Sequence, residues 1–236
     1  MVSIDRVYQR VLALANKEQR GYITPQDFNL FANQAQMEIF EQYFYDVNMA
    51  RKGQGNDTVY ADVDDMLEEK LQIFERTDDT STYTITSGLI TLPVNRIYRV
   101  NAIFRANPYA QCEIMNTKDF EHARYGGYLI QPTNTRPIAN IKNNTLLILS
   151  TVNTIVTNAF ITFFKVPSKV EWAYVVMNNK AMYNEGAQVD FELHRSEETQ
   201  LVNKILKLAG ISIKQPDVVQ VAAGIEGATN QQQPKI

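Results

Sequence analysis

Few residues in this sequence have side chains that could carry out covalent chemistry, and they stand far apart. Cys112 is the single cysteine, and a thiolate at this position would be a nucleophile. No histidine lies near it in sequence, and it falls within the strand-like run QCEIMN. We therefore interpret Cys112 as a buried structural thiol and not as a catalytic residue.

The two histidines are the next candidates, for metal binding or proton transfer. His122 falls within a short predicted helix among charged residues, and His194 lies just before a predicted helix cap. They are distant in sequence, and neither has the ligand spacing of a motif such as HExxH. Both are interpreted as surface or boundary residues.

One cluster of carboxylates could hold a metal ion if further ligands converged on it. Its members fall in the first turns of a predicted helix, where negative charge is favoured by the helix dipole, so we interpret the cluster as a solvated acidic face. The sequence also has no GxSxG, Walker-type or GxGxxG motif. We predict a non-enzymatic protein without a metal or cofactor. The cluster comprises Asp64, Asp65, Glu68 and Glu69.

Composition excludes further classes. A net charge of −3 argues against a surface that grips phosphates. The chain has no run of 18 apolar residues, and its first residues, MVSIDRVYQR, lack the apolar core of a signal peptide. One cysteine cannot form an intramolecular disulfide, which is typical of a reducing compartment. We therefore expect a protein without membrane contact that is made and used in a soluble compartment.

The elements that must position these residues begin with three predicted helices. The second has the clearest start, because Thr24 can cap it, Pro25 suits its first position and Asp27 can complete a capping box. Its aromatic residues lie on more than one face, so we predict that it packs against a neighbouring copy; a central core helix is the alternative. The proposed subunit contacts are Phe31, Phe40, Tyr43 and Phe44.

From Ser81 the pattern changes to short runs rich in β-branched and aromatic residues. Ser87-Gly88 and Asn143-Asn144 predict hairpin turns, and short connections favour antiparallel pairing. We predict an α+β fold: a helical bundle with a central antiparallel β-rich insertion and a C-terminal helix plus extended tail. The predicted parts are an N-terminal helical part (1–80), the β-rich insertion (81–170), a return to the helical body (171–210) and an extended C-terminal arm (211–236).

Three functional classes compete on these observations: an assembly protein that forms large interfaces with copies of itself, a monomeric binding module for a peptide or glycan, and an enzyme. The aromatic second helix, the polar tail, and the segments 51–58 and 172–190, which have little to pack against, favour the first class. The first two differ in mass, because an assembly protein forms a large species whereas the module stays near 27.0 kDa.

Two runs carry a resemblance to virion proteins of short-tailed, crAss-like bacteriophages. They are GYITPQDFNLFANQAQMEIFEQYFYDVN (21–48) and DFELHRSEETQLVNKILKLAGISIKQPDVVQ (190–220). Between them, TYTITSGLITLPVNRIYRVNAIF resembles a passage of phage head–tail connector proteins. The resemblance covers both ends of the chain well and its middle loosely.

The resemblance implies a head–tail connector or adaptor, that is, a neck or tail ring protein of the virion, made in the host bacterial cytoplasm. Such rings of about twelve copies bind the portal protein and neighbouring tail rings, and genomic DNA passes through them without specific binding. The mildly acidic charge suits that passage. The family carries no catalytic residues. Another tail ring or a head-decorating protein is the alternative within this class. The C-terminal residues expected to dock on a partner ring are Ile211, Ile213, Val218 and Val219.

Overall fold

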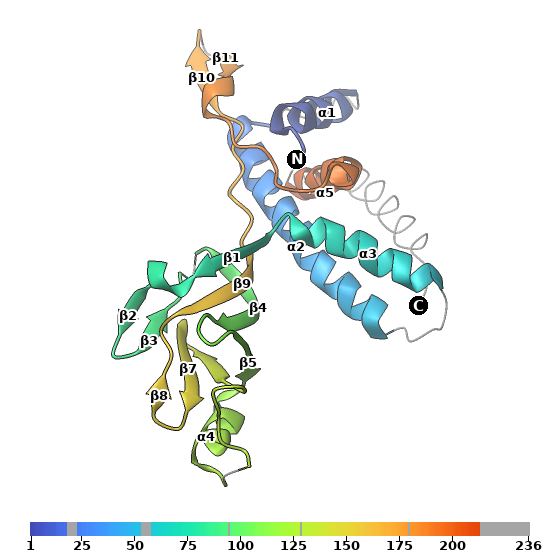
Figure 1. The fold of residues 1–236 in the computed structure, drawn as a ribbon. Coiled ribbons are helices and arrows are strands. Elements are labelled where there is room, and N and C mark those ends of the chain that lie inside the picture. Colours follow the sequence, from blue (N-terminus) through green and yellow to red (C-terminus); the bar gives the residue numbers. More distant parts are fainter. Residues whose placement is uncertain (18–22, 53–57, 94, 128, 179, 213–236) are drawn as a thin grey trace. The chain divides into compact units, whose positions relative to one another are not determined.

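The computed structural model describes residues 1–17, 23–52, 58–93, 95–127, 129–178 and 180–212 (Figure 1). The chain divides into two compact units. A helical unit comprises Met1–Ile73 and Pro167–Ile236, and a β unit comprises Phe74–Val166. No helix in the described ranges has the length and apolarity needed to cross a membrane.

The helical unit is built from α1 (Ile4–Lys17), α2 (Pro25–Lys52), α3 (Thr58–Gln72) and α5 (Glu198–Ser212). Thr24 caps α2 as predicted, because Asp27 N donates to Thr24 Oγ1 (3.2 Å); the Asp27 carboxylate reaches back to the Thr24 hydroxyl, with Thr24 Oγ1 donating to Asp27 Oδ2 (2.6 Å). α2 packs on α5 and α3, and α1 packs on α5. The core between them is formed largely by Val7, Tyr8, Phe28, Ala35, Ile39, Phe40, Leu201 and Ile205.

The β unit contains one sheet of nine strands in the order β1-β9-β4-β5-β6-β7-β3-β2, with β8 paired to β7. The sheet is curled, and one face encloses a core that includes Ile90, Ile103, Ile148, Ile161 and Phe163. The strands are β1 (Glu75–Asp79), β2 (Thr84–Thr86), β3 (Leu89–Thr91), β4 (Ile97–Arg105), β5 (Ala110–Met115), β6 (Ile138–Lys142), β7 (Thr145–Thr151), β8 (Thr154–Ile155) and β9 (Ala159–Lys165).

Both predicted hairpin turns are present. Ser87 and Gly88 have φ values of 53° and 81° between β2 and β3, and Asn143 and Asn144 have φ values of 48° and 62° between β6 and β7. Positive φ at both central residues is the type I′ geometry that matches the twist of a two-residue hairpin. These turns place β2 beside β3 and β6 beside β7.

The predicted fold class, a helical bundle with a central antiparallel β-rich insertion, is wrong. The dominant structure is the nine-stranded, curled, mixed sheet, accompanied by five α-helices in the described ranges. The sheet is mixed because β5 and β6 are parallel. Their connection, residues 116–137, includes α4 (Thr117–Tyr125) and is long enough for a crossover, whereas the sequence argument treated every connection as too short.

A second, two-stranded sheet belongs to the helical unit. β10 (Tyr174–Met177) and β11 (Lys180–Tyr183) pair only with each other in the described structure. Short 3₁₀ helices flank the elements at η1 (Thr80–Thr82), η2 (Glu185–Ala187) and η3 (Arg195–Glu197). The predicted C-terminal arm lies outside the described residues from 213 onward.

Candidate functional site

The residues whose side chains could carry out chemistry do not lie close together in the described structure. Cys112 is buried, and burial raises the pKa of its thiol to about 11, so the thiol is protonated at neutral pH. His122 is exposed on α4, while His194 caps η3, with Ser196 N donating to its Nδ1 at 3.3 Å. Among the described side chains, no group of three or more His, Cys, Asp and Glu residues is placed to hold a metal ion.

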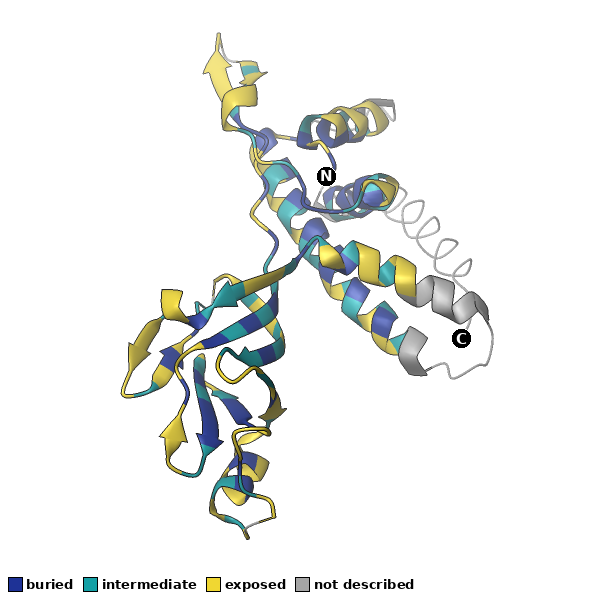
Figure 2. Cartoon of the chain, in the orientation of Figure 1, coloured by how far each residue is buried: buried dark blue, intermediate teal, exposed yellow. Residues whose placement is uncertain are grey.

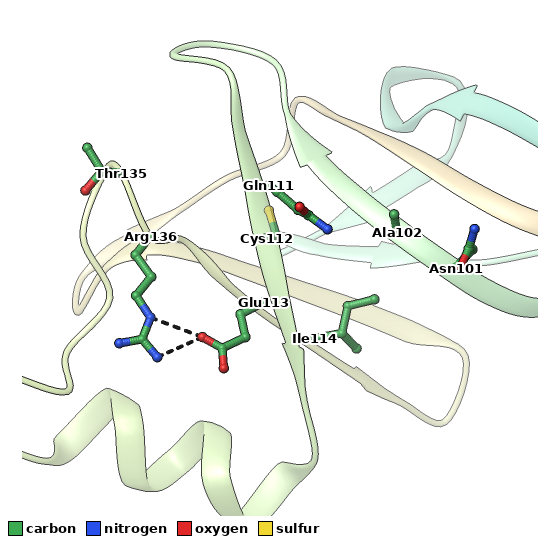
Figure 3. Close-up of a pocket in the computed structure, with 8 residues that line it drawn as sticks. All are labelled: Asn101, Ala102, Gln111, Cys112, Glu113, Ile114, Thr135 and Arg136. Atoms are coloured by element: carbon green, nitrogen blue, oxygen red, sulfur yellow. Dashed lines mark hydrogen bonds and ion pairs between the residues drawn. The ribbon is translucent and has the colours of Figure 1, made fainter. Parts of the chain in front are cut away.

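One pocket, of about 470 Å³, opens on the β unit beside β4 and β5 (Figure 3). Arg136 and Glu113 point toward each other across it, with Arg136 Nε and Nη2 donating to Glu113 Oε2 at 3.1 and 2.8 Å. Both side chains are half exposed, so this pair contributes little stability. The pocket offers hydrogen bonding through polar side chains. Its lining is Asn101, Ala102, Gln111, Cys112, Glu113, Ile114, Thr135 and Arg136.

The most unusual surface is the hairpin formed by β10 and β11. We name this hairpin together with the residues on either side of it, within 171–189, the hairpin arm. Its ends are joined by an antiparallel bridge, in which Glu171 N donates to Val189 O (3.1 Å) and Val189 N donates to Glu171 O (2.9 Å). Figure 1 shows the arm extending past the N-terminal end of α2, and Figure 2 shows that most of it is exposed.

The hairpin arm exposes apolar side chains on both faces. Val175 pairs with Met182 and Val176 pairs with Ala181, and because paired residues share a face while neighbours alternate, these two pairs lie on opposite faces. Val176 is 63% exposed and Met177 is 57% exposed. An isolated two-stranded hairpin is marginally stable in water, and a cluster of exposed apolar residues marks an interaction site.

An aromatic cluster at the base connects the arm to the helices. Trp172 is buried and stacks on Tyr174 and Tyr183, with ring centroids 6.0 and 5.5 Å apart. Its other neighbour is Tyr8 of α1 at 4.3 Å, and Tyr8 in turn contacts Phe28 of α2 at 4.7 Å. The indole Nε1 donates to Asp5 Oδ1 at 3.0 Å, so the polar edge of the buried ring is also satisfied.

Three amide side chains of α2 hold the chain segment that leads into the arm; we name Asn29, Asn33 and Gln36 the amide ladder. Trp172 N donates to Asn29 Oδ1 (2.8 Å), and Asn29 Nδ2 donates to Trp172 O (3.3 Å). Asn33 binds the backbone of Val170 in the same two-way manner, with both distances 2.9 Å.

The last member of the ladder, Gln36, donates from Nε2 to Ser168 O at 2.8 Å and accepts from Glu192 N at 3.3 Å. Four helical residues rise about 6 Å, and alternate residues of an extended chain lie about 6.6 Å apart. Amides one turn apart on α2 therefore meet alternate residues of the extended segment, much as a neighbouring strand would. The sequence signal for this contact was a row of amides at i, i+4 and i+7 on one face of α2, and our sequence reasoning missed it.

Comparison with known proteins identifies no family. No family model matches the chain, and no curated protein matches its sequence.

The residues predicted as subunit contacts lie in different environments. Phe40 and Tyr43 are buried in the core of the helical unit, where burial and the carboxylate of Glu197 raise the pKa of the Tyr43 hydroxyl. Phe31 and Phe44 are half buried, and the Phe44 ring packs edge-on against Phe40 at 5.1 Å. Of the four predicted contacts, only Phe31 and Phe44 have side-chain surface available for a neighbouring copy.

The residues predicted to dock on a partner ring cannot be placed in the same way. The backbone of Ile211 belongs to α5, and its side chain lies outside the described part of the structure. Ile213, Val218 and Val219 also lie outside the described residues. Their docking role stays a prediction.

Proposed function

We propose that this chain is a structural virion protein that assembles with copies of itself into a ring in the neck or tail of a short-tailed, crAss-like bacteriophage. The ring would link the portal to the tail and continue the DNA channel. The observation that carries the assembly role is the hairpin arm, a largely apolar two-stranded element that the described residues of its own chain leave exposed while they hold its base in place.

The way the base is held supports a binding role for the arm. Trp172 is packed among aromatic rings, and the amide ladder fixes the backbone of residues 168–172 through bonds at 168, 170 and 172. Holding an apolar surface in one position before binding lowers the conformational entropy that association costs. Residues at the arm's end gain nothing from this support unless another molecule covers them.

The phage assignment is supported by the resemblance in residues 21–48 and 190–220. These two runs contain most of α2 and all of α5, helices that pack on each other in the core of the helical unit. The net charge of −3 suits a channel wall along which DNA slides without binding. A ring of about twelve copies, with the portal and neighbouring rings as partners, follows from the resemblance.

A monomeric binding module is the second candidate, and the pocket beside β4 and β5 favours it. Its polar lining, with amides at Asn101 and Gln111 and charges at Glu113 and Arg136, could hydrogen-bond a glycan or a peptide. Within the virion class, another tail ring or a head-decorating position is the alternative.

The deciding experiment measures the mass of the purified chain by light scattering across a range of concentrations, alone and with the portal protein of the same phage. We expect a ring-sized species in at least one condition, visible by electron microscopy. Val176→Asp with Met182→Asp should abolish it, whereas Lys118→Glu with Glu121→Lys on α4 should not. A chain that stays near 27.0 kDa alone and with portal would refute the proposal.

A further inference from the structure

The outer helices of the helical unit carry opposite charges on their exposed faces. α1 packs on α5, α5 on α2, and α2 on α3. Figure 1 shows α5 between α1 and α3, so these two helices form opposite flanks of the unit.

The exposed face of α1 is basic. Arg6 and Arg10 lie one turn apart, and both pair with the single carboxylate of Glu198, at 3.2 and 2.7 Å. Two guanidinium groups thus share one negative charge. The acidic residue of this helix, Asp5, is turned toward Trp172 and accepts a hydrogen bond from its indole. Leu14, one turn beyond Arg10, is 46% exposed.

The exposed face of α3 is acidic. Asp65 and Glu69 also lie one turn apart, both are exposed, and no cation of the described residues pairs with either. Lys70, the cation in the last turn of α3, is instead turned inward onto Glu197 at 2.6 Å. Met66, beside Asp65, is 61% exposed.

We propose that α1 of one copy docks antiparallel against α3 of a second copy. Residues four apart on both helices are separated by about 6 Å, so Arg6 can meet Glu69 while Arg10 meets Asp65. In this register Leu14 lies one turn beyond the Arg10–Asp65 pair and Met66 lies between the levels of the two ion pairs, so each adds exposed apolar surface beside the charged contact. Arginine and carboxylate form paired, directional hydrogen bonds in such contacts.

The contact joins two different surfaces and is therefore heterologous. Such a contact leaves the acidic flank of the first copy and the basic flank of the second copy free for further subunits, so it closes into a ring or continues as a filament. This inference rests on the proposed function, because it names two further faces, besides the hairpin arm, through which the copies would associate.

Charge reversal tests it directly. Arg6→Glu with Arg10→Glu makes both flanks acidic, and Asp65→Lys with Glu69→Lys makes both basic. Because like charges oppose each other at the contact, each variant alone should need at least ~10-fold more protein to assemble. An equimolar mixture should return to the wild-type range, because each flank of one variant then meets its opposite on the other. A chain with all four substitutions should assemble alone.

Two controls separate this effect from other causes. Lys118→Glu with Glu121→Lys alters charge on the exposed face of α4 and should leave assembly unchanged. Glu198→Gln removes the partner of the arginines within their own chain and should not impair assembly. Circular dichroism checks that each variant is folded.

A second measurement does not depend on the reversed charges. Arg6→Cys with Glu69→Cys, in a Cys112→Ser background, places the two thiols opposite each other in the proposed register and should give a ladder of disulfide-linked multimers on mild oxidation. Wild-type assembly that is unaffected by either reversal, failure of the mixture to recover while both variants are folded, or absence of the ladder would each overturn the α1–α3 contact. A wild-type chain that never assembles would overturn the proposed function itself.

Discussion

The amide ladder makes the sharpest prediction about stability. Asn33→Ala removes the side chain that binds the backbone of Val170 in both directions at 2.9 Å and donates to Asn29 O at 2.7 Å. Val170 is only 2% exposed, so its N–H and C=O lose their partners in a place that water reaches poorly. Each lost hydrogen bond costs about 1 kcal/mol, and a buried group left unsatisfied costs about 1–3 kcal/mol. We expect the free energy of unfolding to fall by about 2–3 kcal/mol.

Urea denaturation followed by tryptophan fluorescence measures this loss, because Trp172 is the only tryptophan and lies at the end of the ladder. With a denaturant dependence of about 2 kcal/mol per molar urea, the midpoint should fall by about 1 M. Gln34→Ala is the matched control: this neighbouring amide is exposed, and among the described residues it bonds only to Glu38, at 3.0 Å. If the free energies of unfolding of the two variants differ by less than about 0.5 kcal/mol, the amide ladder does not hold residues 168–172 as argued.

The β unit and the interior of the helical unit make three further predictions. Cys112 should react slowly with a thiol reagent at pH 8 and quickly in urea, because burial raises the pKa of its thiol to about 11. The folded protein disfavours the thiolate, so stability falls as the pH rises from about 9, where the unfolded thiol ionises, to about 11. Cys112→Ala should remove that part of the stability loss. Fast native labelling would contradict this. Gly88→Ala should lower the free energy of unfolding by about 1 kcal/mol, because φ is 81° there; an unchanged thermal midpoint would show that the turn relaxes. Lys70→Met should cost about 3 kcal/mol in urea denaturation, since it leaves buried Glu197 without its 2.6 Å partner, while Lys118→Met on an exposed face should cost nothing measurable.

Local features of the fold could be predicted because they depend on residues close together in the chain. The start of α2 follows from Thr24, Pro25 and Asp27, and the hairpin turns follow from residue pairs that tolerate positive φ. The exposure of the arm was partly visible too, because residues 172–190 had little obvious packing. The same reasoning failed for β5 and β6, whose parallel pairing depends on a crossover that contains a whole helix.

The sequence alone therefore indicated the long helices, the two hairpin turns and a strand-rich region after Ser81, and showed that the chain lacks the familiar motifs of catalysis; it did not indicate β1 or the β10–β11 hairpin. Tertiary structure decided which strands become neighbours, as when β1 pairs with β9, and which aromatic residues of α2 are covered, since Phe40 and Tyr43 are buried while Phe31 and Phe44 remain partly open. It also decided that Asn29 and Asn33 bind an extended segment more than 130 residues away along the chain. The physical reason is that capping and turn preferences act over a few residues, whereas burial and backbone pairing depend on which distant segment the folded chain brings alongside.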